Sequence, residues 1–222
     1  KMLQIPRNIF VTTDASFSGN YQINAIAKTQ GSNGGNNISA LADEIYNIFG
    51  LHVDGYLSVR LEALTQIIDT FGGIKVYVPQ EMDYGGSHLS QGYQTMDGAA
   101  AEFFLRTRHI YADSDLGRLR MQRYFYAALF ARMRSMTVWD IAKLLPVITS
   151  QMETDLSSTE LVSVAVSMLK ISSSNIMFCQ IPVYMGQAIS YNGNSTVVVA
   201  RQETADLLNE YFRENTGPVD AS

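Results

Sequence analysis

Apolar and polar residues follow two periods along this 222-residue chain, and segments of one period alternate with segments of the other. An apolar residue every three to four positions predicts an amphipathic helix, and one every second position predicts a strand. Segments of helical period are residues 38–49, 61–71, 98–106, 118–134, 137–150, 157–170 and 201–213. Segments predicted to be strands are residues 2–11, with a turn at Pro6, and 53–59, 74–79, 175–183 and 195–199. Helices that alternate with strands favour an α/β fold in layers.

Capping residues mark several of these boundaries. Asn37 or its neighbour is a plausible N-cap for the helix at 38–49, and Gly50 ends that helix. The stretch 80–96 is mostly turn-forming residues, and the helix that follows begins after Asp97. Glycine and proline are spread too evenly to mark an internal linker, so we expect one domain over 1–215 and a disordered tail at 216–222.

Composition narrows the function classes. An apolar fraction of 46% and a charged fraction of 17% predict an ordinary globular protein. A net charge of -5 excludes general attraction to nucleic-acid phosphates or anionic lipid. The single cysteine, Cys179, lies in an apolar run typical of a buried, inert thiol, and the three histidines lack metal-ligand spacing. There is no apolar run of eighteen residues and no signal peptide, so an anchor of the native protein would lie outside this sequence.

Arginine is concentrated in one stretch, "LRTRHIYADSDLGRLRMQRYF" at 105–125. It holds five of the eleven arginines: Arg106, Arg108, Arg118, Arg120 and Arg123. In an acidic chain this pattern predicts a local anion site, because guanidinium forks match phosphate oxygens and keep their charge. Arg106 and Arg108 would leave the same side of an extended segment, while Arg118 would open a helix, whose N-terminus also favours anions. The alternative is a helix start held by surface ion pairs.

The helix that Arg118 opens has one stripe directed to the core. Gln122 lies one turn after Arg118 on that stripe, and Phe125, Leu129 and Met133 continue it. The arginines off the stripe are expected to be solvated: Arg120, Arg123, Arg132 and Arg134. Asp115, three residues before Arg118, has two open interpretations, either capping or arginine orientation, or direct chemistry.

Five motifs in a fixed order resemble the LytR-CpsA-Psr family of bacterial cell-envelope proteins. They are "LQIPRN", "INAIAKTQG", "LTQIIDTFGGIKVYVP", "LSQGYQTMDGAAAEFFLRTRH" and "DLGRLRMQ", with "ISYNGNSTVVV" similar to the closing segment of the family. The resemblance implies a central mixed sheet sandwiched between helical layers, with an apolar tunnel for a polyprenyl chain. It implies a phosphotransferase that moves a glycan phosphate from an undecaprenyl-pyrophosphate carrier to peptidoglycan, making wall teichoic acid or capsule linkages.

The resemblance also implies Mg²⁺ as cofactor, no nucleic-acid partner, and a location outside the cytoplasmic membrane, anchored through an N-terminal helix absent from this sequence. The residues that match the family motifs are expected to contact the pyrophosphate, with Arg108 and Arg118 as the catalytic pair. This expected site consists of Arg7, Arg106, Arg108, Arg118 and Gln122.

The chain departs from the family pattern at three places. Asn8 stands where the family usually has Asp, and Met121 stands where Arg is common. The strands that carry an Arg-x-Asp-Thr stretch, whose acidic group serves the metal, have no counterpart here, so the metal ligands are unknown. Two alternatives remain, a chain that lacks a segment of the full protein or a non-catalytic module that binds polyprenyl phosphate or serves as a scaffold in an envelope complex.

Overall fold

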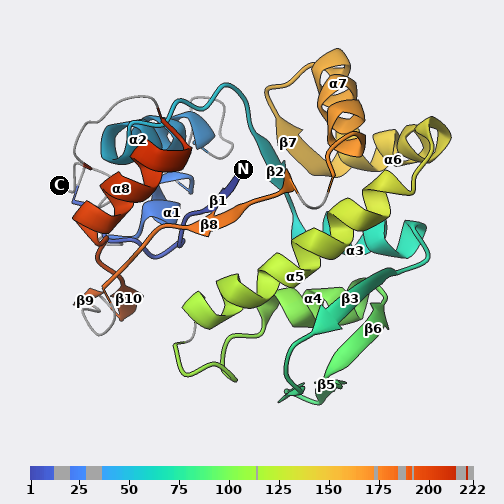
Figure 1. Ribbon diagram of the computed structural model, residues 1–222, viewed down its shortest axis with the longest axis horizontal. Coiled ribbons are helices and arrows are strands. Elements are labelled where there is room, and N and C mark those ends of the chain that lie inside the picture. The colour runs from blue at the N-terminus through green and yellow to red at the C-terminus, as the bar shows by residue number, and fades with distance from the viewer. Residues whose placement is uncertain are drawn as a thin grey trace. The chain divides into compact units, whose positions relative to one another are not determined.

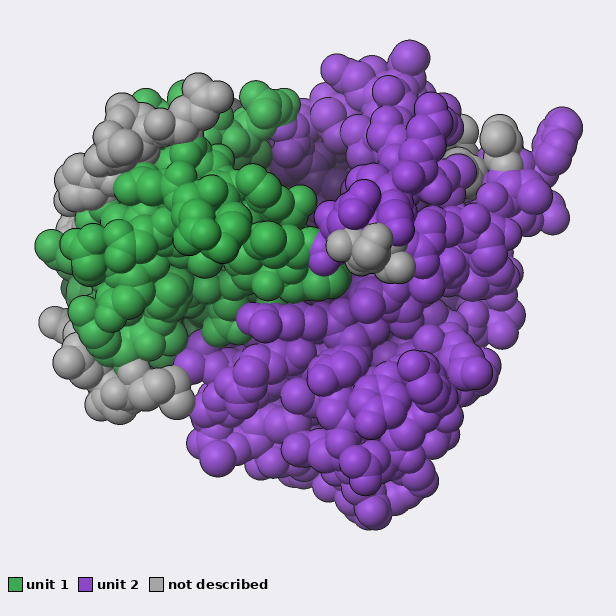
Figure 2. Space-filling model, viewed as in Figure 1, with its two compact units in different colours: residues 1–54, 177–222 green, residues 55–176 purple. Residues whose placement is uncertain are grey.

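The computed structural model describes residues 1–12, 21–28, 37–113, 115–172, 175–184, 189–191, 193–213 and 219. The chain divides into two compact units (Figure 2). Each unit has its own apolar core. Unit 1 is Lys1–Asp54 with Met177–Ser222, and unit 2 is Gly55–Ile176. The single domain expected over 1–215 stays a prediction.

Unit 1 is built from both ends of the chain. Its elements are β1 (Met2–Gln4), α1 (Ile23–Ile26), α2 (Ile38–Phe49), β8 (Phe178–Gln180), β9 (Ile189–Tyr191), β10 (Asn194–Thr196) and α8 (Arg201–Tyr211). β1 pairs with β8 in parallel, and β9 pairs with β10 antiparallel. Single bridges from Ile9 to Val197 and from Val183 to Val199 carry the pairing beyond these strands. The N-terminal segment is thus fixed by residues more than 170 positions away.

Unit 2 contains the arginine-rich stretch. Its elements are β2 (Leu57–Val59), α3 (Leu61–Thr70), β3 (Ile74–Val78), β4 (Met82–Tyr84), β5 (Ser87–Leu89), β6 (Gly92–Met96), α4 (Gly98–Arg106), α5 (Asp115–Arg134), α6 (Val138–Gln151), β7 (Met152–Thr154) and α7 (Ser158–Leu169). β3 alternates between buried and exposed residues and pairs with β6, and α5 packs against β3 (Figure 1). Phe104 of α4 and Phe125 of α5 are fully buried in this core, so both helices are held firmly where the arginines begin.

The mixed α/β class expected from the sequence is confirmed, and the long helices lie where their periodicity places them. Asn37 caps α2 and Gly50 ends it in the left-handed conformation, as predicted. The described strands pair two by two, in five two-stranded sheets. The apolar tunnel stays a prediction.

Two expectations are corrected. The stretch 80–96 is not mainly turns, because it holds β4, β5 and β6, whose residues Met82, Leu89 and Met96 point into the core. In the expected tail, Val219 is 3% exposed and packs in the core of unit 1, because a valine in contact with that core is removed from water. The other residues of the tail lie outside the described part.

The start of α4 generates a testable prediction. The Asp97 carboxylate accepts a hydrogen bond from the backbone N–H of Ala100 at 2.8 Å, which satisfies one of the free donors of the first turn. Asp97→Ala should lower the free energy of unfolding by about 1 kcal/mol. For a chain of this size that is a fall of roughly 2–4 °C in Tm, measured by calorimetry. An unchanged Tm would show that this cap is not needed.

Candidate functional site

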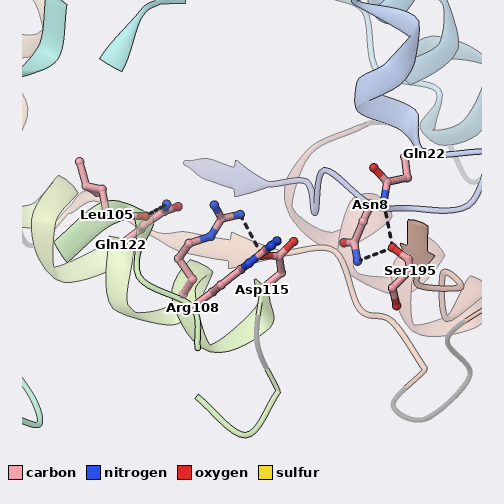
Figure 3. Close-up of polar contacts among 8 residues, drawn as sticks. Asn8, Gln22, Leu105, Arg108, Asp115, Gln122 and Ser195 are labelled. Atoms are coloured by element: carbon pink, nitrogen blue, oxygen red, sulfur yellow. Dashed lines mark hydrogen bonds and ion pairs between the residues drawn. The ribbon is translucent and has the colours of Figure 1, made fainter. Parts of the chain in front are cut away.

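The arginine-rich stretch forms a compact ionic cluster in unit 2. Asp115 is the first residue of α5 and is 9% exposed. One of its carboxylate oxygens, Oδ1, lies 3.4 Å from a guanidinium nitrogen of Arg118 and 3.7 Å from one of Arg108. Figure 3 shows Arg108 directed at Asp115. Two cations therefore share one anion, and the cluster keeps an excess of positive charge at the N-terminus of a long helix.

The two arginines differ in exposure. The Arg118 side chain is 17% exposed and the Arg108 side chain is 41% exposed. A guanidinium offers five N–H donors in a fixed plane, so an ion-pair contact with one carboxylate oxygen leaves capacity for a second anion. Burial of Arg118 lowers the local dielectric and strengthens its field, while Arg108 remains open to solvent. This arrangement suits an incoming phosphate group.

Gln122 fixes the arrangement of the two helices. Its side-chain Nε2 donates to the backbone oxygen of Leu105 at 3.0 Å, next to the last residue of α4 (Figure 3). Carbonyl groups in the last turn of a helix have no partner within the helix, so this bond satisfies one of them and ties α4 to α5. Gln122 thus positions the segment that carries Arg108, in addition to its expected role at the pyrophosphate.

Arg106 occupies a different position from the one expected. It is the last residue of α4, so the extended backbone that would place it beside Arg108 is absent. Its guanidinium lies 2.8 Å from Glu102, one turn earlier, and its side chain is 67% exposed. The structure therefore brings Arg108 and Arg118 together at Asp115, holds Gln122 at Leu105, and places Arg106 outside this cluster.

Arg7 lies in unit 1, on an exposed position beside the buried Asn8. The Asn8 and Gln22 side chains both donate to the backbone oxygen of Ser195, at 3.4 Å and 2.9 Å (Figure 3). The Oδ1 atoms of Asn8 and Asn24 accept no hydrogen bond from the described residues. Buried amide oxygens without a donor are unfavourable, which marks this place as able to take a hydrogen-bond donor.

The described residues do not form a magnesium site. No group of three or more His, Cys, Asp and Glu side chains is placed to hold a metal among them. Asp115 faces two guanidinium groups that would repel a cation, and Asn8 offers a neutral oxygen where Mg²⁺ prefers carboxylate or phosphate. Mg²⁺ as cofactor therefore stays a prediction.

The loop before α5 is held by a second ion pair. Asp113 pairs with Arg120, with one N–O distance of 3.0 Å, and also accepts a backbone hydrogen bond from Gly117. The hydrogen bond from Arg120 is the main cause that lowers the pKa of Asp113. Gly117 is needed for this approach, because a Cβ there would lie 2.4 Å from Cβ of Tyr111 and 2.6 Å from Asp113. The loop folds back tightly onto the first turn of α5.

Sequence reasoning missed Tyr126, and it misplaced Arg132 as well as Arg106. Tyr126 lies near Arg118, whose charge partly offsets the rise in the Tyr126 pKa caused by burial. The spacing 118, 122, 126 would have placed it on the same stripe. Arg132 is not simply solvated, because it donates to the Phe71 backbone oxygen at 2.9 Å and its guanidinium lies over the Phe71 ring.

A model of the LytR_cpsA_psr family matches residues 1–213 of this chain. The chain belongs to the LytR_cpsA_psr family. Among the described residues, no helix has the length and apolar character needed to cross a membrane.

Curated relatives of this family member are named for cell-wall assembly. It is 25% identical over 213 residues to the cell wall biosynthesis protein LcpA of Corynebacterium glutamicum, covering 93% of this chain and 39% of LcpA. It is 32% identical over 114 residues to the polyisoprenyl-teichoic acid–peptidoglycan teichoic acid transferase TagU of Oceanobacillus iheyensis, covering 51% of this chain and 36% of TagU. The chain thus spans less than half the length of these relatives.

Solved structures show the same fold. TagV of B. subtilis matches with a TM-score of 0.74 at 22% identity, over 98% of this chain and 84% of TagV. TagT bound to LI-WTA matches with a TM-score of 0.70 at 19% identity, over 94% of this chain and 76% of that chain. At these identities the likeness establishes the fold alone.

The pair of Asp113 and Arg120 generates a pH prediction. Because the pKa of Asp113 is lowered in the folded state, its stabilisation is complete well above the ordinary Asp value and is lost as the pH falls through the folded-state pKa. Asp113→Asn should therefore lower stability by about 0.5–1 kcal/mol at pH 7. The gap to wild type should begin to narrow near about pH 4, the ordinary Asp value, and should close only below the lowered folded-state pKa, where both chains lack this charge. Thermal unfolding from pH 7 to pH 3 measures it, and a constant gap would contradict the assignment.

Proposed function

We propose that this protein is a phosphotransferase that joins a glycopolymer, such as wall teichoic acid or capsular polysaccharide, to peptidoglycan at the outer face of the bacterial cell membrane. The donor is a polyprenyl-pyrophosphate-linked glycan. The observation that carries the proposal is the shared Asp115, which holds Arg108 and Arg118 together at the N-terminus of α5. The names of the curated relatives support the substrate class.

The arginine cluster suits what phosphoryl transfer requires of a protein. The acceptor hydroxyl attacks the phosphorus attached to the glycan, and the bond from that phosphorus to the bridging oxygen breaks. Polyprenyl phosphate leaves with the bridging oxygen, and the hydroxyl proton passes to solvent. Charge builds up on the phosphoryl and leaving oxygens, and fixed donors such as Arg108 and Arg118 stabilise it without having to reorganise.

The proposed roles follow from exposure and position. Arg118, mostly buried and fixed, would bind and orient the pyrophosphate, and the more exposed Arg108 would close on it from the α4–α5 loop. Gln122 would hold α4 and α5 in a fixed arrangement through its hydrogen bond to the Leu105 backbone oxygen. Arg106 and Arg7 remain expected contacts from the family motifs.

A second candidate function is a non-catalytic module that binds the polyprenyl phosphate carrier. The neutral, buried Asn8 at the position of the family's Asp favours it, because an amide cannot accept a proton as a carboxylate can. Turnover separates the two functions. A module would bind the carrier and release no polyprenyl phosphate when an acceptor and Mg²⁺ are added.

The role of Arg118 can be tested with a synthetic polyprenyl pyrophosphate. Arg118→Ala should weaken binding by about 1.5–3 kcal/mol because charge-assisted bonds are lost. That is roughly a 10- to 150-fold rise in Kd by calorimetry. Arg60→Ala is the control, because Arg60 is exposed and lies outside the cluster. Equal effects from the two variants would indicate diffuse attraction and contradict a formed site.

The role of Asp115 separates the two interpretations left open by the sequence. If the carboxylate orients the arginines, Asp115→Asn should raise the Kd for polyprenyl pyrophosphate by about tenfold, because hydrogen bonds to a charged group contribute roughly 1.5–3 kcal/mol. Direct chemistry by this carboxylate would instead leave Kd unchanged and abolish transfer. Measurement of Kd and single-turnover transfer on the same preparation decides between them.

A further inference from the structure

An exposed aromatic face covers the strand pair of β3 and β6 in unit 2, and the arginine cluster does not use it. Tyr77 and Tyr93 are directly opposite each other in the register of the two strands, with ring centroids 5.2 Å apart. Tyr124 of α5 adds a third ring, 5.8 Å from that of Tyr77. The Lys75 ammonium lies 5.2 Å from the Tyr93 ring centroid. We name these four residues the tyrosine face.

The rings are open to solvent. Tyr93 is 69% exposed, Tyr124 is 40% exposed and Tyr77 is 37% exposed. The other side of β3 is buried against the core, so the strand cannot turn these rings inward without exposing Ile74, Val76 and Val78. The planes of the Tyr93 and Tyr124 rings are inclined by 62° and 47° to that of Tyr77, so the three adjacent rings form a surface of aromatic faces and edges. Such a surface fits a partner that has both apolar faces and polar edges.

Charge indicates the sign of the partner. The three elements that carry the tyrosine face, β3, β6 and α5, hold six basic residues and one acidic residue, in a chain whose net charge is -5. Neither strand has an acidic side chain. The partner is therefore expected to be anionic.

We propose that the tyrosine face docks an N-acetylated amino-sugar glycan strand, the backbone of the peptidoglycan acceptor. Pyranose rings have flat C–H faces that stack on the negative face of an aromatic ring, and their hydroxyls bond at its edge. The stem peptides extend from alternate sugars, and their carboxylates meet the Lys75 side of the tyrosine face. A polyol-phosphate polymer is anionic too, but it has no ring faces for the tyrosines.

The tyrosine face and the arginine cluster both include residues of α5. Tyr124 follows Arg118 by six residues, which is roughly 9 Å along the helix axis, on a different side of the helix. The tyrosine face thus holds the strand near the arginine cluster and does not itself hold the reacting hydroxyl. This inference rests on the proposed transfer to peptidoglycan, and it names the surface that binds the acceptor.

The test is co-sedimentation of the chain with peptidoglycan sacculi from which attached polymers have been removed. Tyr93→Ala should raise the apparent Kd by roughly 3- to 10-fold, since one exposed stacking ring is lost. Tyr93→Phe should keep most of the affinity, because the ring remains. The matched control is Tyr46→Ala, an exposed tyrosine of unit 1 that contacts His52. Circular dichroism and Tm establish that every variant is folded.

Three other outcomes would each overturn the proposed docking surface. Equal losses from Tyr93→Ala and Tyr46→Ala would mean nonspecific adhesion. Stronger, Tyr93-dependent binding to purified polyol-phosphate polymer would assign the surface to the donor. Self-association that Tyr93→Ala abolishes, seen by sedimentation velocity, would make it a contact between copies. Polyprenyl-pyrophosphate binding is measured in parallel. If the chain binds sacculi but not polyprenyl pyrophosphate, the proposed transfer alone is rejected. If it binds polyprenyl pyrophosphate but not sacculi, only the docking surface is rejected.

Discussion

The geometry of the site depends on one carboxylate that two guanidinium groups share. Asp115 is nearly buried, and a buried anion is costly unless it is paired. Its pairing with Arg108 and Arg118 reduces that cost and at the same time holds two like charges close together before any ligand arrives. Bringing two arginines together costs free energy because their like charges repel. Folding supplies this free energy before phosphate binds, so the anion site is preorganised.

Helix α5 combines three tasks on different sides. Its first turn carries the ionic cluster, Phe125 fills the core of unit 2, and Tyr124 belongs to the exposed tyrosine face. Core burial of one side fixes the rotation of the helix, and the directions of the polar and aromatic side chains then follow from the period of 3.6 residues. A change in core packing around Phe125 would therefore move the site and the tyrosine face together.

The sequence predicted most helices and the members of the cluster, because helical period and capping are local properties. It placed Arg118 and Gln122 on one stripe, and it anticipated that Asp115 could orient arginines. It failed where partners are distant in sequence. The contact of Arg132 with Phe71 and the pairing of Tyr77 with Tyr93 depend on tertiary contacts and strand register, which no local pattern specifies. Arg106 was misplaced because it was expected to lie in an extended segment with Arg108. It is instead the last residue of α4.

The close approach of the loop to Gly117 has a consequence for sequence variation. A side chain at 117 would overlap Tyr111, whose burial raises its pKa to about 12, and would push on Asp113. Positions 111, 113 and 117 are therefore free to change only as a group. A homologue that keeps the glycine before the arginine can keep this loop path, whereas one with a larger residue there must route the loop differently, whatever its overall identity to this chain.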